Sequence, residues 1–220
     1  MRSAPVPTRR RALLGALVAA AVGLVGVAPA QAQRETQYVL VAQWPPSETP
    51  LNQMGSPGGL AVRADGTVYL ADFLANRVAM MAPDGNWNQV FGNQGVGPDR
   101  VNNPNDIEVD NAAGQVYVAD YDSYRLVVYD LEGNFIRYVP DIFVSGMERG
   151  PDGNLWLADR LSNKVRVFDP AGAEVFSFGR RGSAQGSFRQ LTDVAVAEGG
   201  DIFVGDRGGS RIQVFRREGD

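Results

Sequence analysis

The sequence predicts an all-β chain that repeats one four-stranded unit four times. The first indication is an internal repeat: four segments superpose without gaps, namely VYLADFLANRVAMM (68–81), VYVADYDSYRLVVY (116–129), LWLADRLSNKVRVF (155–168) and IFVGDRGGSRIQVF (202–215). Each has an apolar strand that ends in Asp, then a polar turn, then a second alternating strand. The second indication is composition, because 26 Gly and 13 Pro suit many short strands joined by turns.

The remainder of each unit repeats as well. A shorter apolar piece precedes each pair of strands (58–62, 105–109, 144–148 and 192–196), and a fourth strand follows the first three pairs (NQVF, FIRY and EVFSF). Turns with Gly, where a positive φ is needed, separate the strands. Four-stranded units at steps of 48, 39 and 47 residues are typical of β-propeller blades, whose first strands line a central channel. The expected blades are therefore 57–103, 104–143, 144–190 and 191–220.

The missing residue types limit the chemistry. The chain contains no His and no Cys. It therefore has no Ser-His-Asp machinery, no thiolate nucleophile, no disulfide and no zinc site made of thiolates. Any catalysis would rely on carboxylates, Tyr, Lys, Arg or a hard cation held by oxygen ligands.

The N-terminus has the pattern of an export signal. A basic start, an apolar run over 12–28 and small residues at Ala30 and Ala32 predict a signal peptide at 1–32, cleaved before Gln33. The alternative is a membrane anchor, but the apolar run is short and the cleavage pattern follows at once. The basic start resembles a twin-arginine signal, and a general secretory signal is the alternative route. We therefore expect a periplasmic or extracellular protein without stable membrane insertion.

The charge of the mature chain argues against one class of partner. Removing residues 1–32 leaves 17 Lys and Arg against 25 Asp and Glu, a net charge of −8. A chain this acidic is a poor binder of nucleic acid, and we expect none as a partner.

These features together resemble NHL repeats. In that pattern a strand ends in A-D-x-x-x-x-R, two further strands follow with a turn between them, and the unit closes with F-G and a Gly-rich link. VFGNQGVGPDRVNNPNDIEVD (90–110) and FSFGRRGSAQGSFRQLTDVAV (176–196) carry the linking portion, and the resemblance covers 38–216. It implies a β-propeller and leaves the function open.

The two ends of the chain suggest a way to close a ring. YVLVAQW (38–44) aligns with the fourth, outer strands of the later blades, but the first three strands of its own blade are missing. Residues 33–56 would then comprise this outer strand and a Pro-rich link. The chain ends where the last blade needs a fourth strand, so pairing the two would remove two exposed edges. NHL-type propellers usually have five or six blades. A closed ring of four blades and a fragment of a larger ring therefore both remain open.

The repeated acid–base pairs are predicted to be structural. A catalytic group is needed once, whereas a clasp is needed in every blade. The Asp can accept turn N–H groups, and the base five residues later can return across the turn. The predicted clasps are Asp72 with Arg77, Asp120 with Arg125, Asp159 with Lys164, and Asp206 with Arg211.

Acids that do not repeat are better candidates for function. In the column of the first strands, Asp106 and Asp193 stand where the other two blades have Gly59 and Gly146. With Asn105 they could hold a Ca²⁺-like ion at the channel mouth. The alternative is that both acids simply serve local backbone.

One further resemblance concerns this position. Pro104-Asn105-Asp106 is similar to a segment of gluconolactonase-type propellers, which implies a metal- or substrate-binding role for Asn105 and a ligand or base role for Asp193. The family's metal-binding Glu has no clear counterpart here. Amidating-lyase propellers use His ligands for zinc, which this chain lacks.

Residues private to single turns form the predicted binding surface: Phe73, Leu74, Tyr121, Asp122 and Tyr124. The primary hypothesis is an exported, non-enzymatic scaffold that binds a protein, peptide or carbohydrate and needs no cofactor. The alternative is a metal-dependent, lactonase-like hydrolase or lyase at the channel mouth, with Asp193 as the catalytic residue.

Overall fold

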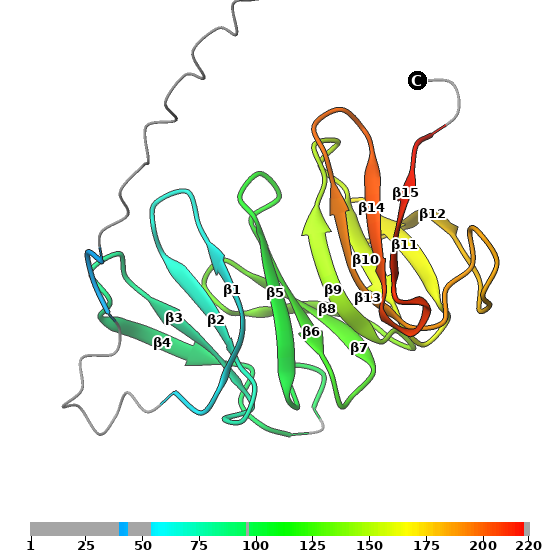
Figure 1. The fold of residues 1–220 in the computed structure, drawn as a ribbon. Helices are drawn as coiled ribbons and strands as arrows, with labels where there is room; N and C mark the ends of the chain where they lie inside the picture. Colours follow the sequence, from blue (N-terminus) through cyan, green and yellow to red (C-terminus); the bar gives the residue numbers. More distant parts are fainter. Residues whose placement is uncertain (1–39, 44–53, 96, 218–220) are drawn as a thin grey trace, which may run out of the picture. The chain divides into compact units, whose positions relative to one another are not determined.

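The structure is a computed structural model that describes residues 40–43, 54–95 and 97–217. Four antiparallel sheets follow one another along the chain, which confirms the predicted all-β propeller fold (Figure 1). The first sheet contains β1 (Pro57–Val62), β2 (Val68–Asp72), β3 (Arg77–Met81) and β4 (Trp87–Phe91), and the second contains β5 (Pro104–Asp110), β6 (Gln115–Asp120), β7 (Arg125–Asp130) and β8 (Phe135–Val139). The third contains β9 (Val144–Arg149), β10 (Leu155–Asp159), β11 (Lys164–Phe168) and β12 (Glu174–Phe178), and the fourth contains β13 (Leu191–Val196), β14 (Ile202–Asp206) and β15 (Arg211–Phe215).

The strands of each blade pair in sequence order. Each Asp that ends a second strand lies opposite the base that opens the third, as in the register of Asp120 with Arg125. The turn between them ends in a residue with left-handed backbone, and φ lies between 52° and 54° at Asn76, Tyr124, Asn163 and Ser210. One turn geometry therefore serves all four blades, with a short 3-10 helix, Arg207–Gly209, in the last.

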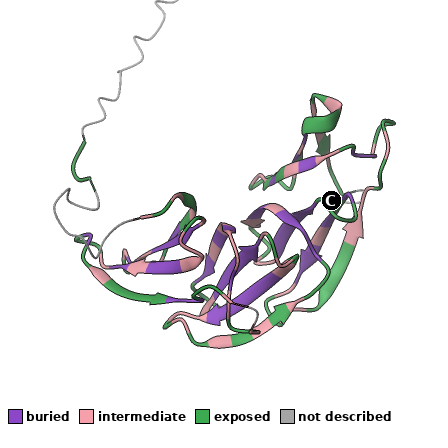
Figure 2. Cartoon of the chain, turned by 90° about the horizontal axis from the view of Figure 1, so that it is seen from below, coloured by how far each residue is buried: buried purple, intermediate pink, exposed green. Residues whose placement is uncertain are grey.

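The apolar core lies between the blades rather than inside any one of them. Tyr69 of the first blade packs in one buried cluster with Ile107 and Tyr129 of the second. Leu126 and Leu157 join the second and third blades, and Trp156 and Val204 join the third and fourth. The buried strands in the middle of the sheets are visible in Figure 2. A blade therefore depends on its neighbours for burial, as expected of stacked repeats.

Glycines let the channel-lining strands approach each other closely. A Cβ atom on Gly59 would lie 2.9 Å from the Cα atom of Asp106, and one on Gly146 would lie 2.9 Å from the backbone oxygen of Thr192. Either contact is closer than real Cβ atoms allow, so each glycine makes room for the first strand of the next blade. The alternation of Gly and Asp along this column thus has a steric cause.

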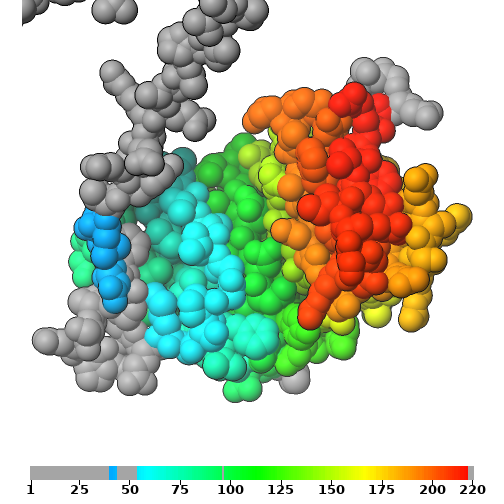
Figure 3. Space-filling view, viewed as in Figure 1, coloured from blue at the N-terminus to red at the C-terminus, as the bar shows by residue number. Residues whose placement is uncertain are grey.

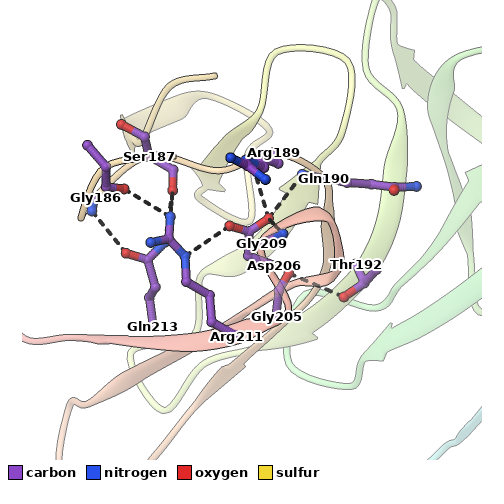
Figure 4. A network of polar contacts seen from close by, with 11 residues as sticks. Gly186, Ser187, Arg189, Gln190, Thr192, Gly205, Asp206, Gly209, Arg211 and Gln213 are labelled. Atoms are coloured by element: carbon purple, nitrogen blue, oxygen red, sulfur yellow. Dashed lines mark hydrogen bonds and ion pairs between the residues drawn. The ribbon is translucent and has the colours of Figure 1, made fainter. Parts of the chain in front are cut away.

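Three of the four predicted clasps form ion pairs, and they fasten more than the turn. Asp206 accepts backbone N–H groups from Arg189 and Gln190, which enter β13, and from Gly209 in the turn. Its other oxygen lies 3.2 Å from Nε of Arg211 (Figure 4). The clasp therefore ties the link that arrives from the preceding blade to the end of the second strand.

The same arrangement recurs in the first two blades. Asp72 pairs with Arg77 at 3.2 Å, and Asp120 pairs with Arg125 at 2.8 Å and accepts the N–H of Asn102. Arg125 also donates from Nη2 to the carbonyl oxygens of Gly97 and Arg100, in the link before β5.

The third clasp differs from the prediction. Asp159 lies 3.6 Å from Nη1 of Arg166 and accepts a hydrogen bond from Ser162, whereas Lys164 forms no ion pair among the described residues. Positions 164 and 166 lie on the same face of β11 because side chains alternate along a strand. The longer, forked arginine therefore replaces the lysine as the partner of Asp159.

Ring closure by the N-terminal strand is not seen. The fourth sheet has three strands among the described residues, and residues 40–43 are irregular, with Leu40 84% and Val41 91% exposed. The remainder of 38–44 lies outside the described residues, so closure stays a prediction. The four blades belong to one compact unit, 42–220, and residues 1–41 to another. Figure 3 shows the first blade in cyan and the last in orange to red, with the green second blade between them.

The predicted signal peptide at 1–32 also lies outside the described residues. In the part of the chain that the structure describes, no helix has the length and apolarity to cross a membrane.

The clasp can be tested in the second blade. Asp120→Ala should lower the free energy of unfolding by about 1–3 kcal/mol, because it leaves the N–H of Asn102 and the Nε–H of Arg125 without their acceptor. Urea denaturation of the mature chain measures this loss. Asp122→Ala, an exposed carboxylate in the same turn, is the matched control and should change stability by less than about 0.5 kcal/mol. Equal losses in the two variants would contradict the clasp.

Candidate functional site

The channel-mouth carboxylates are engaged by backbone rather than free. Asp106 Oδ1 accepts the N–H of Ile107, and Oδ2 accepts the N–H of Met147 in the next blade at 2.9 Å. Asp193 Oδ1 accepts the N–H of Val194. Asn105 donates to the carbonyl oxygen of Val144, while its buried Oδ1 has no hydrogen-bond partner. Asp106 and Asn105 thus join β5 to β9, whereas Asp193 bonds within its own strand.

Burial makes these acids weak. It raises the pKa of Asp106 to about 6, with a smaller contribution from the negative charge of Asp193. Burial likewise raises the pKa of Asp193, and it raises that of Glu108, on the same strand as Asp106, to about 7. Backbone N–H groups oppose all three shifts without cancelling them.

These residues fit a divalent cation poorly. Both oxygens of Asp106 already accept N–H groups, which leaves fewer lone pairs for a metal ion. Among the described residues, no group of three or more Asp, Glu, His or Cys side chains is placed to hold an ion. Calcium takes six to eight oxygen ligands. Glu48, which is nearest in sequence to the expected metal-binding Glu, lies outside the described residues.

The predicted binding surface, by contrast, assembles into a chain of aromatic rings. The rings of Phe73 and Tyr121 are 5.9 Å apart between centroids, although they come from different blades. Phe143, just before β9, lies 4.6 Å from the ring of Tyr121 and 5.2 Å from that of Tyr124. These rings therefore form one continuous row from the first blade across the second to the link before β9.

A cavity of about 480 Å³ opens beside these rings; we call it the rim cavity. It is lined by Tyr121, Tyr124, Phe143, Arg160, Leu161, Asn163, Arg181, Arg189 and Gln190. The lining carries cationic and neutral polar groups, and no carboxylate belongs to it. Of the predicted surface residues, Tyr121 and Tyr124 line this cavity, whereas Phe73 touches Tyr121 from outside and Leu74 and Asp122 are exposed elsewhere on the turns.

Tyr124 occupies an unusual backbone position. Its φ is 52°, and the equivalent turn residue is Asn in the first and third blades. Asn adopts the left-handed region readily, whereas a bulky aromatic residue does so rarely and at a cost. Tyr124 is also 51% exposed, so packing alone does not account for it. An exposed residue held in a disfavoured conformation is a pointer to function.

Sequence reasoning missed the cavity's other walls. Arg160 stands in its turn where Tyr121 stands in the preceding one, and its guanidinium lies 5.3 Å from the ring of Phe143. Comparing each turn with the next blade's turn would have suggested Arg160 and Asn163. Arg189 aligns with Asn102 in the equivalent link of residues 92–103, so comparing the two links would have suggested it as well. Phe143 lies in a shorter link, for which the repeat offers no copy of the same length.

The weak acids lead to a test of pH dependence. Because the pKa of Glu108 is about 7 in the folded state and 4.5 in the reference state, the folded chain binds more protons between these values. Stability should therefore fall as pH rises through this window. Glu108→Gln should flatten the slope and gain about 1–2 kcal/mol at pH 8, after allowance for solvent screening.

Urea denaturation at a series of pH values from 4 to 8 measures the slope. Glu132→Gln, on an exposed turn, serves as the control and should leave it unchanged. A slope in Glu108→Gln equal to that of the parent chain would contradict the assignment.

Comparison with known proteins supports the fold and part of the repeat assignment. A family model described as a 6-bladed beta-propeller matches residues 54–147, and the NHL repeat model matches 188–215. NHL repeat-containing protein 3 from Homo sapiens is 28% identical over 178 residues, which cover 74% of this chain. The chain spans about half the length of that relative.

Solved structures are similar in fold. Virginiamycin B lyase from Staphylococcus aureus, as a catalytically inactive variant with quinupristin, matches with a TM-score of 0.56 and 16% identity, over 76% of this chain and 58% of its own. A protein from Lactobacillus plantarum matches with a TM-score of 0.58 and 21% identity, over 74% and 52%. Hydrazine synthase from Kuenenia stuttgartiensis has a TM-score of 0.55, 15% identity and coverages of 82% and 53%. The chain thus has the β-propeller fold, and its residues 188–215 match an NHL repeat.

Proposed function

We propose that this chain is an exported, non-enzymatic scaffold that binds its ligand in the rim cavity. The observation that carries the proposal is the exposed Tyr124, which is held at a left-handed turn position and joined to Tyr121 through Phe143. The second and third blades form the cavity through their turns and the links that follow them, and loops carried by a rigid framework are common binding elements.

Several features favour binding over catalysis. The rim cavity has no carboxylate in its lining, and the chain contains neither His nor Cys, so general-base or nucleophilic residues are scarce there. Aromatic residues, in contrast, anchor many binding interfaces. Export is supported by the N-terminal signal pattern. The acidic charge of the mature chain argues against nucleic acid as its partner.

The experiment restores the residue of the sibling blades. Tyr124→Asn should bind ligand at least tenfold more weakly, because the exposed ring is lost, while the free energy of unfolding stays equal or rises slightly, since Asn suits the left-handed turn. Binding of the mature chain to immobilised panels of oligosaccharides and of peptides provides the readout, and urea denaturation checks the fold. Leu74→Asn changes an exposed residue of another blade's turn, outside the cavity, and is the matched control. Retained binding in Tyr124→Asn would refute the rim site.

A metal-dependent hydrolase or lyase at the channel mouth is the second candidate. The unpartnered Oδ1 of Asn105 and the weak acid Asp106 favour it, while the engaged oxygens of Asp106 count against it. On the scaffold proposal, the melting temperature should not change between EDTA and added Ca²⁺, Mg²⁺ or Zn²⁺. An ion-dependent rise that Asp193→Asn abolishes, together with hydrolysis of a sugar lactone, would favour the enzyme instead.

A further inference from the structure

Three arginines of the rim cavity lack the partners that most arginines of this protein have. Eight arginines lie within 4 Å of an Asp or Glu oxygen in the described residues: Arg63, Arg77, Arg100, Arg125, Arg149, Arg166, Arg211 and Arg216. In the same part of the chain, no ion pair or side-chain hydrogen bond engages the guanidinium of Arg160, Arg181 or Arg189. The three residues nevertheless line one cavity.

The three arginines concentrate positive charge along one cavity whose lining holds no carboxylate. Like charges that share a site repel one another, and the chain as a whole is acidic, with a net charge of −4 before any cleavage. A cavity walled by three cations and no carboxylate therefore attracts an anion. Arginine is the side chain whose fork matches a carboxylate or phosphate with two parallel hydrogen bonds.

The neutral lining distinguishes between kinds of anion. Asn163 is only 8% exposed, yet its Oδ1 has no hydrogen-bond partner among the described residues. The terminal torsion of Asn is soft, so a small rotation lets this oxygen accept from a bound group. A simple inorganic anion is a poor source of such donors, whereas a ligand with hydroxyl groups beside its charge supplies several. The Gln190 amide and the Tyr121 and Tyr124 hydroxyls extend this polar lining.

The aromatic wall adds a flat, partly apolar surface. Phe143 is 7% exposed, and the guanidinium of Arg160 lies over its ring, which leaves the exposed Tyr124 as the ring most open to a ligand. A pyranose ring has an apolar C–H face and a polar rim, so it can contact such a ring while its hydroxyls reach the amides. We propose that the rim cavity binds an acidic saccharide, with a uronate carboxylate held by Arg160, Arg181 and Arg189.

This inference rests on the proposed binding function and adds the ligand's chemical class. The probes are trimers of galacturonate, glucuronate-containing trisaccharides and trimers of mannuronate, measured by calorimetry with the mature chain. The fully methyl-esterified trigalacturonate is the matched probe, because it keeps the ring and hydroxyls and loses the charge. At least one acidic trimer should bind, and for trigalacturonate the ester should bind at least tenfold more weakly if that trimer is a ligand. Added salt should weaken binding of the acid.

The variants test the three cations directly. Arg160→Gln, Arg181→Gln and Arg189→Gln should each weaken binding of the acidic trimer by about threefold to tenfold, because each removes a charged hydrogen bond that nearby solvent partly screens. Arg207→Gln is the control: this exposed arginine in the neighbouring turn does not line the cavity. Its affinity should match that of the parent chain.

Several outcomes would overturn the proposal, and they separate it from the parent function. Failure of all the acidic trimers to bind, or equal binding of acid and ester, removes the acidic saccharide. Binding of a peptide that depends on its free C-terminal carboxylate and on Tyr124 also removes it, but preserves the rim site as a scaffold. If neither saccharides nor peptides respond to Tyr124→Asn, the rim-site function itself fails.

Discussion

The fold depends on burying four aspartates and satisfying each of them. Asp72, Asp120, Asp159 and Asp206 are at most 2% exposed, and an unpaired buried carboxylate would be costly. Each is satisfied from two directions, by backbone N–H groups of the chain entering its blade and by an arginine. Losing either the backbone N–H groups or the arginine would leave part of a buried carboxylate without a partner. The turn and the link that enters the blade are therefore both held in place. A sequence-local pair thereby sets how one blade connects to the next.

Much of this architecture could be predicted from the sequence, because the same strand and turn pattern occurs four times and each copy supports the assignment of the others. The fifteen described strands lie where the four aligned copies predict them, and the Asp–Arg spacing identified the clasps. Lys164 was the exception, because strand alternation makes positions 164 and 166 equally able to face Asp159. Comparison of the four repeats identifies the spacing that recurs. In the structure, the longer arginine side chain at position 166 contacts Asp159 in place of Lys164.

The candidate site was less predictable for the opposite reason. Tyr121 and Tyr124 were recognisable because they depart from their sibling turns. Phe143 lies in the short link 140–143, which has no copy of the same length. Arg189 aligns with Asn102 in the other long link, where each residue donates its backbone N–H to the Asp of its blade, so only its side chain departs from the repeat. The meeting of Phe143 and Arg189 with Arg160 is set by how the blades stack around the channel, a long-range property. The acids at the channel mouth illustrate the converse. Asp106 stood out in the alignment, yet its two oxygens accept backbone N–H groups, one from its own strand and one from the first strand of the next blade.

The alternation of glycine and aspartate along the inner strands has a consequence for how such a chain can grow. Each aspartate lies against a glycine of the preceding blade, at Gly59 with Asp106 and at Gly146 with Asp193. Copying a blade with aspartate in tandem would set two carboxylates side by side and crowd the strands. Copying a blade with glycine would set two glycines side by side and leave a gap. Copying a pair preserves the row. The unit of duplication, and of any shuffling of parts by design, is therefore two blades, even though the unit of structure is one.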